Sequence, residues 1–171
     1  NAENLMAACA AVEGLTSEVA REALSEYSPP EHRCELVAVI DGVEYLNDSK
    51  ATNLHALESA LRSQTRPVIL IAGGKQKGSD YRPLTSLLAQ KAKAMISFGE
   101  IGEELRSIFA TTVQCQKVET LEEAVAMAAV MAERGETILF SPGTSSFDQF
   151  NGYEERGRAF KAALPQMIKT L

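Results

Sequence analysis

The stretch Val68–Gly74 reads VILIAGG, a continuous apolar run that ends on two glycines. An uninterrupted apolar run of this length is typical of a strand that is buried on both faces of a parallel sheet. The glycine pair marks the turn by which such a strand leaves the sheet. The stretch therefore predicts a central strand, and with it a sheet that is covered by helices on both faces.

Strand-like and helix-like segments alternate on the carboxyl side of this run. We expect helices at 83–91, 103–109, 121–134 and 148–171, and strands at 94–98, 113–118 and 137–140. Such alternation predicts an α/β fold with a mostly parallel, Rossmann-like sheet, because each crossover helix returns the chain to the same end of the sheet.

The amino side of the run adds an antiparallel element and a boundary. Two apolar runs at 34–40 and 43–46 are joined by Asp41-Gly42, a strong hairpin signal, and a helix is expected at 54–62. Further upstream, helices expected at 2–12 and 17–27 end at Ser28-Pro29-Pro30, because proline cannot continue a helix. We interpret residues 1–28 as closing helices of a preceding domain and residues 29–171 as a separate domain.

The composition limits the classes of function. The chain has 171 residues, 45% of them apolar, and a net charge of −6 without a cluster of basic residues. A nucleic-acid partner is therefore not expected, and no apolar run approaches the roughly 20 residues of a membrane span. Three cysteines without a CxxC pair favour reduced thiols over a disulfide scaffold or a zinc site. No signal peptide is visible after Asn1, although a longer parent protein could have carried one.

Four polar or glycine-rich segments follow predicted strands, where open α/β sheets bind their ligands. They are Asn47–Asn53 (NDSKATN), Gly73–Asp80 (GGKQKGSD), Gly99–Gly102 (GEIG) and Ser141–Asp148 (SPGTSSFD). We interpret the Gly99 segment as an ordinary turn. The other three carry charged groups and hydroxyls, which we expect to converge at one edge of the sheet.

The chemistry of these segments is not that of a P-loop or a serine hydrolase. Gly73 and Gly78 have P-loop spacing, but the Gly-Lys-Ser/Thr order is absent. A flexible loop with ammonium groups instead suits a carboxylate or phosphate ligand. The Ser141 segment lacks the G-x-S-x-G elbow, and only His32 and His55 are available as bases, so a hydrolase triad is not expected. No His, Cys and Asp cluster has metal-ligand spacing.

Taken together and in order, these segments resemble the Mur ligase family. The matching residues are Asn47–Asn53, Gly73-Gly74-x-x-Lys77-Gly78-x-Asp80, Ser141–Phe150, Tyr153-Glu154-x-Arg156-Gly157-x-x-Phe160, His32-Arg33 and Asn1–Asn4. The chain departs from the usual family sequence at three places. It has Ser-Pro-Gly-Thr-Ser-Ser where Ser-Pro-Ala-Cys-Ala-Ser is frequent, Glu31 where proline is frequent, and Tyr153 where phenylalanine is frequent. These departures indicate a different branch of the family with the same reaction.

The resemblance implies the last domain of a three-domain, cytoplasmic, monomeric ligase that uses ATP with Mg²⁺ and forms ADP. Such an enzyme adds D-glutamate to UDP-N-acetylmuramoyl-L-alanine through an acyl phosphate. The reaction serves peptidoglycan synthesis, and with it cell wall biogenesis, cell shape and cell division. The P-loop and the metal ligands would lie outside this chain, so the chain alone is expected to be inactive. The resemblance implies neither insertion into a membrane nor the binding of nucleic acid.

The resemblance also implies roles for particular residues. Asn1 and Asn4 would hydrogen-bond the adenine, and Arg33 and Asp48 would hold the nucleotide, with Asp48 accepting from the ribose hydroxyls. The D-glutamate carboxylates would be bound by Lys77, Thr52 and Ser146 and by the backbone N–H groups of Phe147 and Tyr153. Lys50 would lie near the phosphates or a carboxylate, and Lys50 and Lys77 are the expected catalytic residues.

Other interpretations of the same residues remain open. Arg33 and Asp48 could form a surface ion pair, Lys77 could be a solvated loop lysine, and Ser146 could cap the last helix. The whole chain could also belong to another Mur ligase or to a folylpolyglutamate-type ligase. A rival from a different class is a non-catalytic, Rossmann-like nucleotide-binding module, which gives Lys77 and Ser146 no role.

Overall fold

The computed structural model of the chain describes residues 6, 9–12, 14–26 and 30–168. The chain divides into two compact units, Asn1–Pro30 and Glu31–Leu171. In the first unit, helix α2 (Ser17–Glu26) agrees with the helix predicted at 17–27, whereas most of the helix predicted at 2–12 lies outside the described residues. The assignment of the first unit to a preceding domain stays a prediction.

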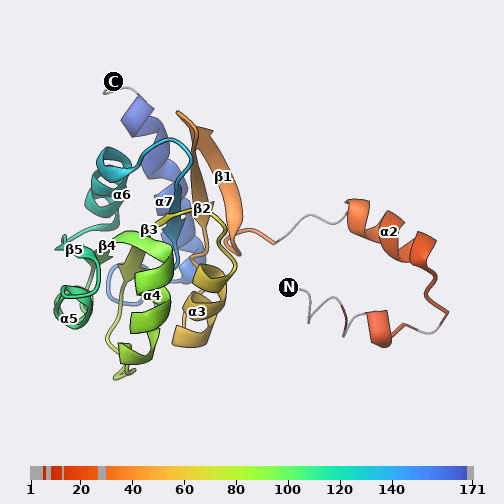
Figure 1. Ribbon diagram of the computed structural model, residues 1–171, viewed down its shortest axis with the longest axis horizontal. Helices are drawn as coiled ribbons and strands as arrows, with labels where there is room; N and C mark the ends of the chain where they lie inside the picture. Colours follow the sequence, from red (N-terminus) through yellow and green to blue (C-terminus); the bar gives the residue numbers. More distant parts are fainter. Residues whose placement is uncertain (1–5, 7–8, 13, 27–29, 169–171) are drawn as a thin grey trace. The chain divides into compact units, whose positions relative to one another are not determined.

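The second unit is built around a six-stranded sheet with the order β1-β2-β6-β3-β4-β5 (Figure 1). All neighbouring pairs are parallel except β1 and β2, which form the predicted antiparallel hairpin. The predicted mostly parallel sheet is thus confirmed. The strands are β1 (Glu35–Ile40), β2 (Val43–Asn47), β3 (Val68–Gly73), β4 (Ala92–Phe98), β5 (Gln114–Lys117) and β6 (Thr137–Phe140).

The hairpin turn has the backbone geometry that its sequence predicts. Asp41 and Gly42 both have positive φ angles, 52° and 83°, as in the two-residue turn whose twist matches that of the flanking strands. Ile40 and Val43 therefore pair directly on either side of the turn. The turn fixes the register of the edge strand β1 against β2 as far as Ala38, beyond which the pairing shifts by one residue.

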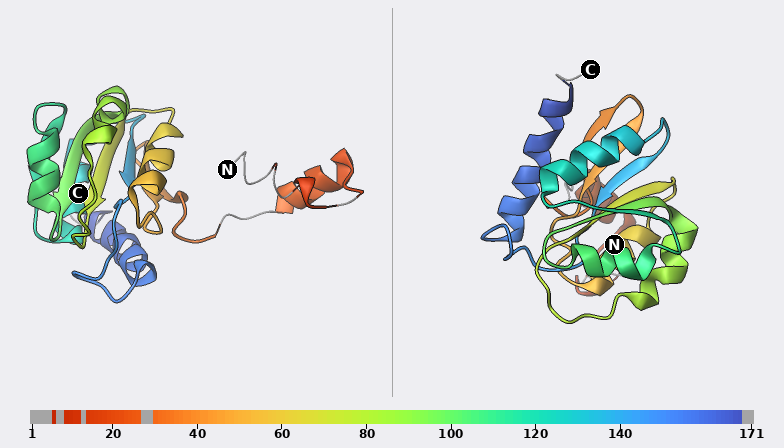
Figure 2. Two further views of the ribbon diagram at one scale, coloured as in Figure 1. Left: turned by 90° about the horizontal axis from the view of Figure 1, so that it is seen from below. Right: turned by 90° about the vertical axis from the view of Figure 1, so that its left-hand side faces the viewer.

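Helices cover both faces of the sheet (Figures 1 and 2). On one face, α6 (Leu121–Met131) and α7 (Tyr153–Ile168) pack on a core that includes Ile69 and Ile71. On the other face, α3 (Leu54–Arg62), α4 (Thr85–Lys91) and α5 (Gly102–Phe109) pack on a core that includes Val68 and Leu70. A short 3-10 turn, η1 (Arg82–Leu84), precedes α4. Successive side chains of β3 thus enter opposite cores, which confirms that this strand is buried on both faces of the sheet.

Two predicted helices have different limits in the structure. The helix predicted at 121–134 ends at Met131, because the following residues turn back and the Gly135 N–H donates to the Gly42 carbonyl of the hairpin. The helix predicted at 148–171 begins only at Tyr153, because the Phe150 N–H closes a turn on the Ser146 carbonyl.

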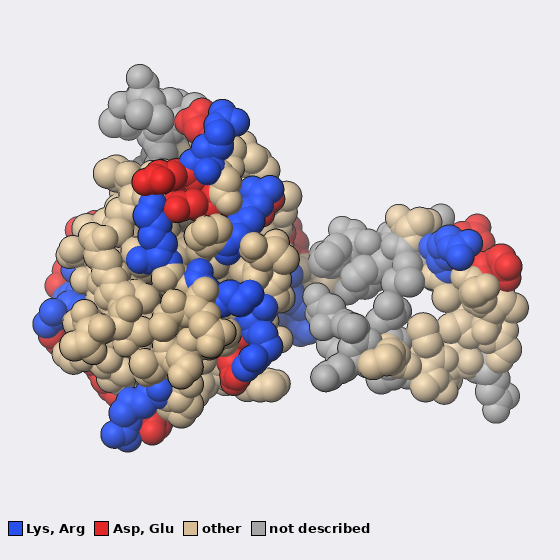
Figure 3. All heavy atoms as spheres, in the orientation of Figure 1, with Lys and Arg blue, Asp and Glu red and all other residues tan. Residues whose placement is uncertain are grey.

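The surface carries charges of both signs. Figure 3 shows Lys and Arg side chains intermixed with Asp and Glu over the face drawn of the larger unit. This distribution agrees with the mixed charge pattern of the sequence. Within the described part of the chain, no helix combines the length and the apolar character that crossing a bilayer requires.

Candidate functional site

Three loops meet at the carboxyl ends of the neighbouring strands β2, β6 and β3. We call residues 48–53 the β2 loop, residues 74–80 the β3 loop and residues 141–148 the β6 loop. Backbone hydrogen bonds join them: Gly143 N–H donates to Ala51 O at 2.9 Å, and Lys75 N–H donates to Ser145 O at 2.9 Å. The convergence expected from the sequence is therefore present at this edge of the sheet.

The structure brings Lys77 and Thr52 together from two of these loops. Lys77 is exposed, and its Nζ lies 3.5 Å from the carbonyl oxygen of Thr52. The neighbouring Lys75 is engaged differently, since its Nζ lies 2.6 Å from Oε1 of Glu100. Among the residues that the structure describes, the Lys77 ammonium meets only this neutral oxygen at the limit of hydrogen-bond distance, so it can accept an anionic ligand.

Lys50 and Tyr153 form a second pair. The Lys50 Nζ lies 5.5 Å from the centre of the Tyr153 ring, within the range of a cation–π interaction. The Tyr153 carbonyl accepts a hydrogen bond of 2.8 Å from Ser49 Oγ, which ties the first residue of α7 to the β2 loop. These contacts restrain the Lys50 side chain beside the loops.

Asp48 lies behind the surface rather than on it. It is 5% exposed, and its two oxygens accept from Cys34 N–H at 3.1 Å and from Ser141 Oγ at 2.8 Å. Burial raises the pKa of this carboxyl, while the two hydrogen bonds and the charge of Arg33 act to lower it. Asp48 thus links Cys34, the residue before β1, to the β6 loop, with the exposed Arg33 close by. The contact of Asp48 with a ribose stays a prediction.

The remaining predicted site residues are placed as follows. Ser146 is 2% exposed in the β6 loop, and the ring of Phe147 beside it is 68% exposed. Ser146 does not cap α7, which begins seven residues later at Tyr153. Asn1 and Asn4 lie outside the described residues.

Sequence reasoning assigned no role to a buried network next to these loops. Asn47 Nδ2 donates to Nδ1 of His32 at 3.0 Å and to the carbonyl oxygen of Gly157 at 3.1 Å. A Cβ atom on Gly157 would lie 2.3 Å from His32 Nδ1, so α7 packs on this ring only because residue 157 is glycine. The sequence could have pointed to this network, because Asn47, His32 and Gly157 each belong to a segment that resembles the family.

Protonation of His32 is expected to weaken this network. Burial lowers the pKa of the His32 imidazole, and Lys161 acts in the same direction, whereas Glu35 and Glu31 act to raise it. Because Nδ1 accepts from Asn47, the neutral ring is the form that fits. The resulting stability is present above the unfolded-state pKa of about 6.5 and is lost as pH falls toward the lower pKa of the folded state.

We therefore expect the free energy of unfolding to fall between pH 7 and pH 5, and to fall less steeply in His32→Asn. The difference in slope is bounded by about 1.4 kcal/mol per pH unit, the limit for one proton. Urea unfolding at several pH values measures it. The matched control is His55→Asn, since His55 is exposed in α3. Equal slopes in the wild type and His32→Asn would contradict this account.

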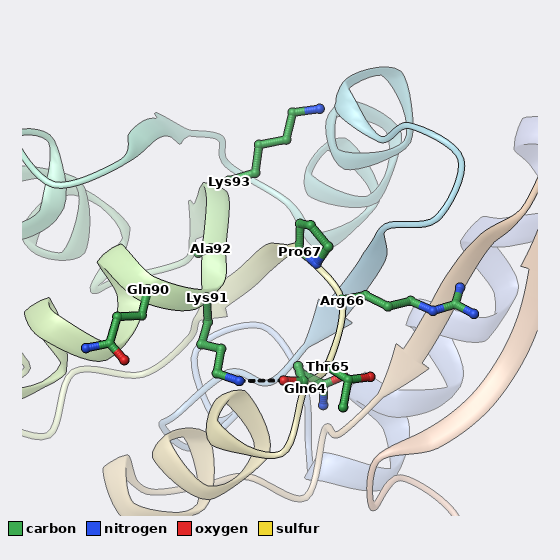
Figure 4. A pocket seen from close by; sticks show the side chains of 8 residues that line it. All are labelled: Gln64, Thr65, Arg66, Pro67, Gln90, Lys91, Ala92 and Lys93. Carbon is green, nitrogen blue, oxygen red and sulfur yellow. Dashed lines mark hydrogen bonds between the residues drawn. The ribbon is translucent and has the colours of Figure 1, made fainter.

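A pocket of about 480 Å³ lies at the opposite edge of the sheet, at the amino ends of β3 and β4 (Figure 4). Its cations are already engaged: Arg66 with Glu44 at 3.1 Å, Lys91 with the Gln64 carbonyl at 2.6 Å, and Lys93 with a pair of glutamates. A second pocket, of about 470 Å³, adjoins the β3 loop and is lined by Gly78, Ser79, Asp80, Arg82, Glu104, Ser107 and Ile108. Only the second pocket borders the candidate site.

The described residues offer no metal site, since no three His, Cys, Asp or Glu side chains among them are grouped to hold an ion. The chemistry that the loops can perform is to bind an anionic ligand and to orient it.

The sequence was compared with models of known protein families. The family model described as the glutamate ligase domain of Mur ligases matches residues 32–144. Among curated relatives, the UDP-N-acetylmuramoylalanine–D-glutamate ligase of Chlorobium chlorochromatii (strain CaD3) is 48% identical over 170 residues, covering 98% of this chain and 37% of the relative. The enzyme of the same name from Myxococcus xanthus (strain DK1622) is 44% identical over 163 residues, covering 94% and 36%. The chain thus spans little more than a third of these relatives.

Solved structures show the same fold at low sequence identity. E. coli FolC in complex with ADP superposes with a TM-score of 0.60 at 14% identity, over 91% of this chain and 36% of that chain. The MurF ligase from Thermotoga maritima in complex with ADP gives 0.52 at 13% identity, over 86% and 33%. A domain of a ligase from Haemophilus ducreyi gives 0.51 at 14% identity, over 81% and 98%.

Proposed function

The chain belongs to the Mur ligase family through its glutamate ligase domain, and from this premise we propose that it is the D-glutamate-binding part of an ATP-dependent ligase. The full enzyme would add D-glutamate to UDP-N-acetylmuramoyl-L-alanine in peptidoglycan synthesis. The names of the curated relatives support this choice of substrate. The structural observation that supports it is that the three loops in which Lys77, Thr52 and Ser146 stand meet at one sheet edge.

The proposed reaction has two steps. The carboxylate of UDP-N-acetylmuramoyl-L-alanine attacks the γ-phosphorus of ATP, which releases ADP and forms an acyl phosphate. The amine of D-glutamate then attacks the acyl carbon, loses a proton, and the tetrahedral intermediate expels inorganic phosphate to leave the amide. Positioning and charge neutralisation dominate such a reaction. This chain would supply the positioning of D-glutamate.

The site can bind both carboxylates of D-glutamate. The Lys77 ammonium and the Thr52 hydroxyl would hold one, because the Lys77 Nζ already lies 3.5 Å from the backbone carbonyl oxygen of Thr52. Ser146 and the backbone N–H groups of Phe147 and Tyr153 would hold the other. Lys50, restrained beside the Tyr153 ring, would neutralise phosphate or carboxylate charge near the reacting atoms.

The nucleotide would lie at the Arg33 side of the site. Arg33 is exposed and offers a planar cation, while Asp48 behind it retains lone pairs for ribose hydroxyls beyond the two hydrogen bonds that it accepts. Asn1 and Asn4 would bind the adenine edge. Mg²⁺, which neutralises the phosphates when bound, would be held by residues outside this chain.

The amino-acid requirement of the full-length enzyme tests the proposal. We expect ADP release with UDP-N-acetylmuramoyl-L-alanine to depend on D-glutamate and not on L-glutamate or a diamino acid. A folylpolyglutamate-type ligase would instead require L-glutamate and a folate. Turnover of that kind, or no ligase activity with any amino acid, would overturn the proposed function.

The 171-residue chain alone is expected to fold but not to turn over ATP. Its sequence contains no G-x-x-x-x-G-K-S/T segment, so the backbone cradle and lysine that grip ATP phosphates are not supplied by these residues. Phosphate release in the presence of Mg²⁺ and both substrates measures this, with a cooperative unfolding transition as the control for folding. Magnesium-dependent turnover by this chain would contradict the expectation.

A further inference from the structure

Arg156 is a fully buried cation in the first turn of α7, with 0% of its surface exposed. Its Nε donates to Ser49 Oγ at 3.1 Å, and its Nη2 donates to the carbonyl oxygens of Ser49 at 2.8 Å and Thr144 at 3.0 Å. One side chain therefore joins α7 to both the β2 loop and the β6 loop.

The acceptors of Arg156 extend this connection to the β3 loop. Ser49 Oγ donates to the Tyr153 carbonyl at 2.8 Å, and Thr144 Oγ1 donates to the Lys75 carbonyl at 2.6 Å. The Lys75 N–H in turn donates to Ser145 O at 2.9 Å. The guanidinium thus joins the loops that carry Lys50, Thr52 and Ser146 directly, and the β3 loop that carries Lys77 is joined to them through Thr144 and Ser145.

Stability does not explain why a cation occupies this position. Among the described residues no carboxylate forms an ion pair with Arg156, and its Nη1 is buried without a hydrogen-bond partner. Burial lowers the pKa of the guanidinium to about 10, although the charge of Asp148 acts to raise it, so the group stays protonated at neutral pH. A buried charge with an unpartnered N–H costs free energy that an apolar side chain would avoid.

The geometry of the guanidinium does explain it. Its planar group directs donors to three acceptors at fixed angles, which the single nitrogen of a lysine cannot do. Gly74 is fitted around the same group, since a Cβ atom there would lie 3.0 Å from Arg156 Nη1 and 2.4 Å from Ser145 O. The backbone at the end of β3 therefore leaves room for this guanidinium only because residue 74 is glycine.

We propose that Arg156 is a positioning residue for the amino-acid site, holding the three loops at the spacing at which Thr52, Lys77 and Ser146 can bind one dicarboxylic amino acid. Arg156 is too deeply buried to touch the substrate itself. It acts through the backbone carbonyls of Ser49 and Thr144 and through the Ser49 hydroxyl. The choice of amino acid rests on the proposed function, whereas the ordering of the loops does not.

Hydrogen–deuterium exchange of the full-length protein without substrate tests the ordering of the loops. In Arg156→Lys, amides of the β2, β3 and β6 loops are expected to exchange faster, while those of β4 and α5 are unchanged. The matched control is Arg158→Lys, an exposed position on the same helix, which should leave all of them unchanged. Unaltered loops in Arg156→Lys, or faster exchange spread evenly over the chain, would overturn the proposal.

Steady-state kinetics of the full-length enzyme then test the effect on the site. Arg156→Lys should raise KM for D-glutamate roughly 10- to 100-fold, as for a misplaced binding group, with KM for ATP changed far less. If the wild type does not use D-glutamate, the proposed function fails while the exchange result stands. If the wild type uses D-glutamate and Arg156→Lys behaves like Arg158→Lys, the positioning role fails.

A second variant keeps the test decisive should Arg156→Lys not fold. Ser49→Ala removes the hydroxyl that accepts from Arg156 Nε and donates to Tyr153 O, and leaves the Ser49 carbonyl in place. It should speed amide exchange in the same loops and raise KM for D-glutamate by a smaller factor than Arg156→Lys does. Loops and KM that match the wild type would overturn the proposal.

Discussion

Gly73→Ala is expected to lower the free energy of unfolding by about 3 kcal/mol or more, because backbone strain and overpacking add at one position. Gly73 ends β3 with a φ angle of 144°, a conformation that residues with a Cβ atom rarely adopt. A Cβ atom there would lie 2.0 Å from the carbonyl oxygen and 2.8 Å from the nitrogen of Phe98. These are backbone atoms of the paired strand β4, which cannot move without breaking the ladder.

Denaturant unfolding of this chain measures the effect, with Gly78→Ala as the matched control. Gly78 lies in the β3 loop that follows and also has a positive φ angle, 70°, but a Cβ atom added there would meet no other atom within 4 Å. That variant should lose only the strain of a left-handed residue, about 1 kcal/mol. A loss for Gly73→Ala no larger than for Gly78→Ala would contradict the close approach of β3 and β4.

The sheet could be predicted from the sequence because its signals are local. The VILIAGG run places β3, and Asp41-Gly42 places the hairpin, each through the conformational preferences of a few neighbouring residues. The predicted end of α6 was wrong because a tertiary hydrogen bond holds the turn that follows it, and the predicted start of α7 was wrong because a local turn from Ser146 to Phe150 precedes the helix. The turn after α6 is bonded to Gly42, far away in the sequence, and no local pattern encodes that contact.

The candidate site was predictable only in part for the same reason. Loops that follow parallel strands share one edge of the sheet, so the convergence around Lys77 could be expected. Arg156 gave no such signal, because its acceptors are mainly backbone carbonyls, of Ser49 and Thr144, that any residue type would supply. A motif can mark such a residue, but only the packed structure shows what it holds.

Lys77→Ala in the full-length enzyme is expected to weaken the use of D-glutamate by roughly 10- to 100-fold, since a charge-assisted hydrogen bond contributes about 1.5–3 kcal/mol. The ammonium is exposed at the edge of the site, 3.5 Å from the Thr52 carbonyl oxygen. The other lysine of the β3 loop, Lys75, is already paired with Glu100 and cannot replace it at the same carboxylate. The fold should be unaffected, because an exposed loop lysine contributes little to the core.

The control for this prediction is Lys75→Ala, which removes a lysine from the same loop whose Nζ already pairs with Glu100 at 2.6 Å. Its effect on D-glutamate should be much smaller, because its charge is neutralised within the domain. Steady-state kinetics with each substrate varied in turn separate the possibilities. In Lys77→Ala, KM for D-glutamate should rise while KM for ATP changes little, because the nucleotide is assigned to Arg33 and Asp48. A sharp rise in KM for ATP with KM for D-glutamate unchanged would instead place Lys77 against the nucleotide, and the assignment of the β3 loop would be wrong.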